Sequence, residues 1–73
     1  MNRIDLHGTR HEGVTRKLDI FFWEMIQKNI NSVEVVTGIS DKMKELVRET
    51  CIDYDFSVTE HPTNVGCLII LLA

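Results

Sequence analysis

Cysteine is scarce in this sequence, and the placement of its two copies excludes two common structural roles. Cys51 falls within a helical pattern and Cys67 begins an apolar run, positions where free thiols often serve as small buried hydrophobic residues. Neither belongs to a CxxC pair, and the three histidines lie too far apart in the sequence to form a local zinc motif. We therefore expect no disulfide bond and no zinc site built from cysteine.

Positive charge is not in excess either. Eight lysine and arginine residues against eleven aspartate and glutamate residues give a formal net charge of −3 at pH 7, which argues against broad attraction to a polyanion. Basic residues nevertheless gather near the start of the chain, at Arg3, Arg10, Arg16 and Lys17. Any binding of phosphate must therefore be local, and this end of the sequence is the place where we expect it.

Long apolar runs, linkers, internal repeats and low-complexity segments are also absent from the sequence. The apolar run at residues 67–73 is far shorter than the roughly 20 residues of a membrane-spanning helix, and the polar N-terminus lacks the apolar segment of a signal peptide. With 44% apolar and 26% charged residues, the composition is that of a soluble globular protein. We expect residues 1–73 to fold as one small cytoplasmic domain that has no contact with a membrane.

The most informative segment that is present lies close to the start of the chain. Ile4 and Leu6 alternate with Asp5 and His7, a period-two pattern that predicts a short strand with one buried face. Asp5 and His7 share the other face, where successive side chains are about 6.6 Å apart along the strand and the carboxylate can orient the imidazole. The sequence thus predicts an acid/base pair, followed by Gly8, which permits a sharp turn or the close approach of a ligand.

Two segments carry helical periodicity. Thr9 and Glu12 have the spacing of a capping box and predict a helix that starts there and runs to about Asn29. Ser40 has the character of an N-cap for a second helix, with Asp41 favourably placed in its first turn. The predicted inward residues are Val14, Leu18, Phe21, Phe22 and Met25 in the first helix, and Met43, Leu46, Val47, Thr50 and Tyr54 in the second.

Three further segments predict strands. Residues 32–37 are rich in β-branched side chains, residues 56–60 alternate, and residues 67–72 follow a turn. The last segment is apolar on both faces, as a central strand would be, whereas the polar residues of the first strand suit an edge. The predicted order of elements is βαβαββ.

The first predicted helix also carries apolar residues on the face opposite its inward stripe. Ile20 and Trp23 lie on that face, and Ile30 extends the group. Scattered apolar residues are normal on a protein surface, whereas a contiguous group marks a surface for a partner or for self-association. Both interpretations stay open, and a homodimer through Ile20 and Trp23, or through the open face of the sheet with Val36, is one expectation.

Two glycine turns are expected to form one site. A strand, helix, strand connection within one sheet makes the two strands parallel, so that His7-Gly8 and Thr37-Gly38 emerge at the same edge, where open α/β sheets bind their ligands. Each turn leads into the N-terminus of a helix, which favours anions. Arg10 and Lys42, each expected in a first helical turn, add fixed charge for a phosphate.

These residues match a known family. Ile4-Asp5-Leu6-His7-Gly8, then Glu12, then Val35-Val36-Thr37-Gly38, resemble the Smr (small MutS-related) domain, which is marked by an LDxH and a TGxG segment in the same order. The resemblance covers nearly the whole chain. It implies an α/β two-layer sandwich of the α+β type, similar to the C-terminal domain of a bacterial translation initiation factor, with both helices on one face of a mixed four-stranded sheet. It also implies nucleic-acid binding and, as in several members, nicking endonuclease activity on DNA or RNA.

The resemblance assigns residues and also shows two departures. The family's Asp and His fall on Asp5 and His7, and the first glycine of TGxG falls on Gly38. The second glycine is replaced by Ser40, and the glycine-rich stretch before the last strand is reduced to Asn64-Val65-Gly66. A side chain at Ser40 limits how closely a phosphate approaches the turn, although its hydroxyl has the chemistry to cap the helix and to donate to an oxygen.

Two functional hypotheses follow. In the first, a nucleic-acid-binding domain acts as an endonuclease in which His7 is the general base or acid, while Asp5 holds the ring or shares in a site for a divalent metal ion. In this hypothesis the nucleic acid contacts Gly8, Arg10, Thr37, Gly38, Ser40 and Lys42. The second hypothesis is a non-catalytic module for protein interaction or self-association. His11 and His61 are expected to be ordinary surface residues.

Overall fold

The structure is a computed structural model, and it describes residues 2–72. Seven elements follow one another along the chain, and their order confirms the predicted βαβαββ arrangement with one short helix added. They are β1 (Asn2–Asp5), the 3₁₀ helix η1 (His11–Gly13), α1 (Val14–Gln27), β2 (Ser32–Val36), α2 (Asp41–Tyr54), β3 (Ser57–Glu60) and β4 (Cys67–Leu71).

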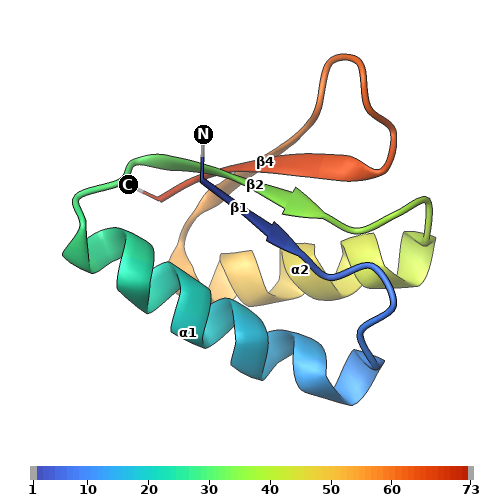
Figure 1. The fold of residues 1–73 in the computed structure, drawn as a ribbon, viewed down its shortest axis with the longest axis horizontal. Coiled ribbons are helices and arrows are strands. Elements are labelled where there is room, and N and C mark those ends of the chain that lie inside the picture. The colour runs from blue at the N-terminus through green and yellow to red at the C-terminus, as the bar shows by residue number, and fades with distance from the viewer. Residues whose placement is uncertain (1, 73) are drawn as a thin grey trace.

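The four strands form one mixed sheet in the order β1-β2-β4-β3. β1 runs parallel to β2, with Ile4 opposite Val35, and β4 is antiparallel to both of its neighbours. Both helices lie on the same face of the sheet (Figure 1). This is the two-layer α+β sandwich that the resemblance to the Smr domain implied, and the first strand lies at an edge and the last in the centre, as the polarity of their faces predicted.

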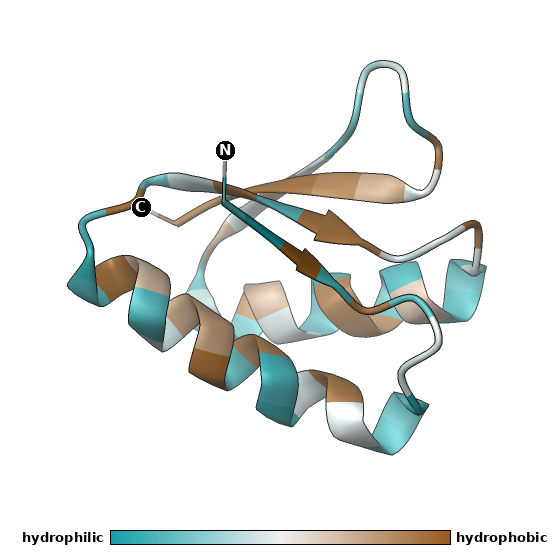
Figure 2. Cartoon of the chain, viewed as in Figure 1, coloured by the Kyte–Doolittle hydropathy of each residue, from teal (hydrophilic) through white to brown (hydrophobic). Residues whose placement is uncertain are grey.

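The core fills the space between the sheet and the two helices. Phe22 of α1 is fully buried and makes edge-to-face contacts with Tyr54 and Phe56, at ring-centroid distances of 5.3 and 5.2 Å. β4 is apolar along its length, in accord with its central position (Figure 2). The buried cluster comprises Leu6, Val14, Leu18, Phe22, Met25, Val33, Val35, Met43, Val47, Cys51, Leu68, Ile70 and Leu72.

Three of the predicted inward residues, Phe21, Leu46 and Tyr54, are less buried than expected. Phe21 is half-buried and Tyr54 is 37% exposed, because Tyr54 stands at the last position of α2 and stacks on Phe56 at the edge of the core. Cys51 takes an inward position in α2 instead, and burial raises the pKa of its thiol to about 11. Cys51 and Cys67 are both free and buried, which confirms the expectation from the sequence.

The start of α1 differs from the prediction. Thr9 does not cap a helix, because its hydroxyl accepts a hydrogen bond from Lys17 Nζ at 3.2 Å and the chain continues through η1 before α1 begins at Val14. Arg10 precedes η1 in an extended conformation, so that it does not lie in a first helical turn. The capping box predicted from Thr9 and Glu12 is therefore wrong.

The start of α2 agrees with the prediction. The hydroxyl of Ser40 accepts a hydrogen bond from the amide of Met43 at 3.1 Å, and Asp41 lies in the first turn. At the other end, the helix stops at Asp55, which has a left-handed conformation with φ 61°. The side chain of Ser40 therefore fixes the point at which the chain leaves the second turn.

We expect Ser40→Ala to destabilise the protein by about 1 kcal/mol, because the mutation removes one N-cap hydrogen bond. For a domain of this size such a loss lowers Tm by roughly 4–8 °C, which thermal unfolding followed by circular dichroism measures. Ser57→Ala serves as the control, since Ser57 is exposed in β3 and has no side-chain hydrogen bond among the described residues. Equal Tm values for Ser40→Ala and the unmutated chain would contradict the assignment.

The open face of the sheet is polar at its centre. Glu34 of β2 accepts hydrogen bonds from Arg3 of β1, the shorter at 2.7 Å, and this contact holds the pKa of the Glu34 carboxyl below its usual value. Val36 is half-buried beside this pair, and Leu71 is 46% exposed. Neither α1 nor α2, the α-helices of the described chain, has the length and apolar character needed to cross a bilayer.

Candidate functional site

The parallel pairing of β1 and β2 brings the two glycine turns together. The amide of Leu6, just beyond β1, donates to the carbonyl of Val36 at 2.8 Å and extends the pairing to the first turn. Gly8 and Gly38 then take positive φ values, 82° and 67°, which other residues adopt only at a cost. Two segments distant in the sequence therefore reverse direction side by side at one edge of the sheet.

The imidazole of His7 lies against the second turn. A Cβ atom placed on Gly38 would be 3.1 Å from Cδ2 of His7, which is tighter than ordinary van der Waals contact. The absence of a side chain at Gly38 thus lets the ring pack against the backbone of the turn. His7 itself is exposed, so that its nitrogen atoms remain accessible from solvent.

Asp5 acts on the backbone of the first turn. Its Oδ1 accepts a hydrogen bond from the amide of His7 at 2.9 Å, and no contact between its carboxylate and the imidazole is present among the described residues. The prediction that Asp5 orients the ring is therefore not met in this conformation. The carboxylate instead fixes the backbone that carries His7, an arrangement typical of aspartate at turns.

Gly66 supports the second turn through backbone hydrogen bonds. Its carbonyl accepts hydrogen bonds from the amides of Thr37 and Gly38, at 2.8 and 3.0 Å. The hydroxyl of Thr37 donates to the carbonyl of Gly38 at 2.7 Å, and Thr37 is only 2% exposed. A Cβ atom on Gly66 would lie 3.2 Å from backbone atoms of Gly38. Thr37, predicted to contact nucleic acid, is thus a buried support of the turn.

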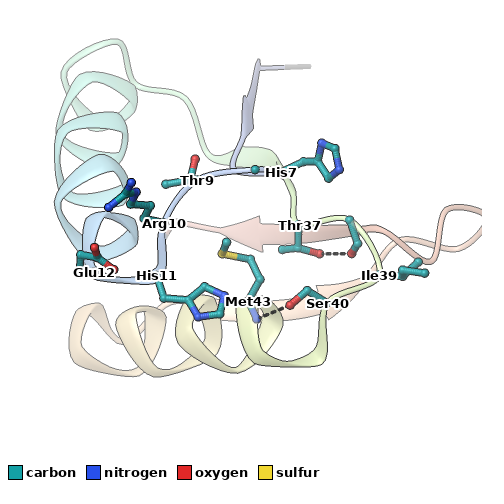
Figure 3. A pocket seen from close by; sticks show the side chains of 11 residues that line it. His7, Thr9, Arg10, His11, Glu12, Thr37, Ile39, Ser40 and Met43 are labelled. Carbon is teal, nitrogen blue, oxygen red and sulfur yellow. Dashed lines mark hydrogen bonds between the residues drawn. The ribbon is translucent and has the colours of Figure 1, made fainter.

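A hollow of about 870 Å³ opens between the two turns and the start of each helix. Figure 3 shows the side chains around it. It is lined by His7, Gly8, Thr9, Arg10, His11, Glu12, Thr37, Gly38, Ile39, Ser40 and Met43. The structure brings five predicted residues together with His7 at one site, namely Gly8, Arg10, Thr37, Gly38 and Ser40, whereas Asp5 and Lys42 do not line the hollow.

Hydrogen-bond donors are available on the α2 side of the hollow. The amides of Ile39 and Ser40 donate to no acceptor within residues 2–72, and the first amides of α2 have no partner inside the helix. The helix dipole adds about half a positive charge at this end. This wall therefore favours an anion, although the carboxylate of Asp41 in the first turn opposes part of that effect.

Sequence reasoning did not assign five of the lining residues to the site, namely Thr9, His11, Glu12, Ile39 and Met43. His11, expected to be an ordinary surface residue, lines the hollow, and Figure 3 places its imidazole toward Met43 at the start of α2. Ile39 is 80% exposed at the rim. His11 lies in η1, a short helix that the sequence did not predict.

The site offers acid/base chemistry and anion binding rather than a built metal centre. Within residues 2–72, no group of three or more histidine, cysteine, aspartate or glutamate side chains is arranged to hold a metal ion. What the geometry brings together is an accessible imidazole, a second imidazole across the hollow, and unpaired backbone amides. Such a combination is suited to moving protons beside a bound phosphate.

Comparison with known proteins identifies the family to which this chain belongs. The Smr domain family matches residues 4–72, and the chain belongs to this family. Among solved structures, the chain is similar to the Smr domain of MutS2 from Thermus thermophilus, with a TM-score of 0.90 and 15% sequence identity over 100% of this chain and 99% of that one. At this identity the likeness shows the fold alone. No curated protein matches the sequence.

Proposed function

We propose that this Smr domain binds nucleic acid in the hollow between its two turns and cleaves a phosphodiester bond there, with His7 as general acid or base. The observation that carries the proposal is the position of His7. Its imidazole is exposed, packs against Gly38, and lies at the rim of a hollow whose other wall presents unpaired amides. A phosphate held by those amides would thus lie beside a group that transfers protons near neutral pH.

The proposed reaction needs one proton to be removed and one to be supplied. The imidazole takes the proton of the attacking water or ribose hydroxyl, the nucleophile forms a bond to phosphorus, and the bond to the leaving oxygen breaks as that oxygen takes a proton from solvent water. A positioned group of this kind contributes about 10²- to 10⁴-fold to a rate. Asp5 serves indirectly, since its carboxylate holds the amide of His7 and thereby the turn that carries the ring.

Binding is proposed to be local and of modest electrostatic strength. Arg10 is exposed on the wall formed by the first turn, and Ile39 is exposed on the opposite turn. Arg10 has the chemistry to pair with a phosphate, and Ile39 offers an apolar surface to a sugar or base. Lys42 lies outside the hollow, so it contributes at most a long-range attraction that salt screens. The net charge of −3 on the chain opposes that attraction.

A binding titration across a salt series tests the binding half of the proposal. With about two phosphates neutralised, the slope of log K against log salt on duplex DNA should be near −1.8, and shallower on single strands. Arg10→Gln should make this slope shallower by about 0.9, which corresponds to one phosphate fewer neutralised. Arg48→Gln is the matched control, because Arg48 is exposed in α2 outside the hollow. No salt-dependent binding to duplex, single-stranded DNA or RNA would overturn the proposal.

A further inference from the structure

The outer face of α1 carries contiguous apolar side chains that nothing in the described chain covers. Ile20, Trp23 and Ile26 are 51%, 64% and 45% exposed, and their spacing places them on one side of the helix. Ile30, which the sequence placed in this group, is half-buried against the core instead. The exposed group therefore consists of Ile20, Trp23 and Ile26.

Two hollows flank Ile20, one on each side of the helix. The larger, of about 460 Å³, lies toward the end of α2 and is lined by Asp19, Ile20, Trp23, Ile26 and Tyr54. Within it, the hydroxyl of Tyr54 donates to Oδ1 of Asp19 at 2.6 Å. The acidic group of this hollow is thus already hydrogen-bonded to the protein, which lowers the cost of covering it with an apolar surface.

The second hollow has the form of a packing site for another helix. Its volume is about 240 Å³, and it is lined by Lys17, Ile20, Phe21 and Glu24 of α1 together with Ile4. The four α1 residues have the i, i+3, i+4, i+7 spacing of the hole that receives a side chain in helix–helix packing. Ile20 is therefore exposed and can insert into a partner helix, and it also lines a hole that can receive a side chain of that helix. A helix that packs against its own copy requires both.

We propose that α1 pairs antiparallel with α1 of a second copy of this chain, around a two-fold axis that passes near Ile20. In such a pair, a residue four positions before Ile20 faces the residue four positions after it. Arg16 of each copy then lies opposite Glu24 of the other. Arg16 and Glu24 are both exposed, and neither forms an ion pair within residues 2–72.

This charge pattern favours a second copy over an unrelated partner. A two-fold interface must be complementary to itself, and the charges on either side of Ile20 are opposite, so that the antiparallel pair forms two Arg16–Glu24 contacts. A parallel pair would place like charges together. Pairing of two short helices covers less than the roughly 800 Å² per partner of a standard interface. We therefore expect a reversible dimer with a dissociation constant in roughly the micromolar range.

Sedimentation equilibrium over a wide range of concentrations tests the surface. The unmutated chain should show a concentration-dependent dimer, and Trp23→Ser and Ile20→Ser should be monomeric with unchanged circular dichroism. Ile52→Ser is the matched control and should dimerise normally, because Ile52 is 74% exposed on α2 and lines neither hollow. A monomer at every concentration, or a dimer that Trp23→Ser leaves intact, would overturn the proposal.

Charge reversal tests the geometry. Arg16→Glu and Glu24→Arg should each weaken the dimer by about tenfold, because each creates two like-charged contacts. The double variant should regain affinity, and a mixture of the two single variants should form a heterodimer, since every contact in it then joins opposite charges. If the mixture fails to associate, the antiparallel pairing around Ile20 is wrong.

Discussion

His7→Ala is expected to lower the rate of nucleic-acid cleavage by about 10²- to 10⁴-fold, because the mutation removes the proposed proton-transfer group. Binding should be nearly unchanged, since the unpaired amides of Ile39 and Ser40 and the side chain of Arg10 remain in place. The measurement is a nicking assay on supercoiled DNA, branched DNA, single strands and RNA, with and without added Mg²⁺ or Mn²⁺. A parallel binding titration separates loss of chemistry from loss of affinity.

The control for this experiment is His61→Ala. His61 lies beyond β3, and its Nε2 is 3.9 Å from Glu34 on the open face of the sheet, away from the hollow. This variant should retain the cleavage rate of the unmutated chain. Cleavage that survives His7→Ala at the original rate would show that the imidazole has no part in the reaction, even if binding at the hollow is confirmed.

Gly38→Ala is expected to reduce cleavage by roughly tenfold or less through displacement of the His7 ring. The new Cβ would lie 3.1 Å from Cδ2 of His7, so the ring must give by a few tenths of an ångström, whereas misplacement of a reacting group by about 1 Å costs about 10²-fold. The positive φ of Gly38 adds a loss of stability of roughly 1–2 kcal/mol. Cleavage rate and Tm should be measured on the same preparations.

Gly8→Ala separates the two effects of Gly38→Ala, which are strain in the backbone and the contact with the His7 ring. Gly8 has a comparable positive φ, 82°, but a Cβ atom there would meet nothing within 4 Å. Both variants should therefore lose similar stability, and any rate loss common to them reports backbone strain. The excess loss at Gly38 reports the contact with His7. If the two variants lose the same rate, the contact between Gly38 and the imidazole has no role in catalysis.

The elements and their order could be predicted from the sequence because the signals that specify them are periodic, whereas the arrangement of helices and sheet in two layers was implied by the resemblance to the Smr domain. Leu18 and Phe22 in α1, and Met43 and Val47 in α2, repeat at helical spacing, so that each helix carries one apolar stripe. The edge position of β1 and the central position of β4 followed from the polarity of their faces. The prediction of each of these features depends on many residues at once, so that a wrong assignment at one residue does not change it.

The details of the site were harder to predict because they depend on single hydrogen bonds. Thr9 has the sequence of an N-cap, yet its hydroxyl bonds to Lys17, and the helix begins after η1. This difference places His11 in η1 and leaves Arg10 outside the helix, and both residues line the hollow. Likewise, a carboxylate two residues before a histidine can accept a hydrogen bond from either the ring or the backbone amide of that histidine. The structure shows that Asp5 accepts from the amide of His7.

Leu6 determines how the site relates to the rest of the molecule. It is fully buried and lies between Asp5 and His7, just beyond β1, a short edge strand that pairs with β2 alone. Separation of β1 from β2 must expose Leu6, which costs about 1.5–3 kcal/mol for a side chain of this kind. The same separation detaches His7 from the second turn while β2, β4 and β3 stay paired. The proposed activity would therefore have its own opening equilibrium, and heating should abolish it before the whole domain unfolds.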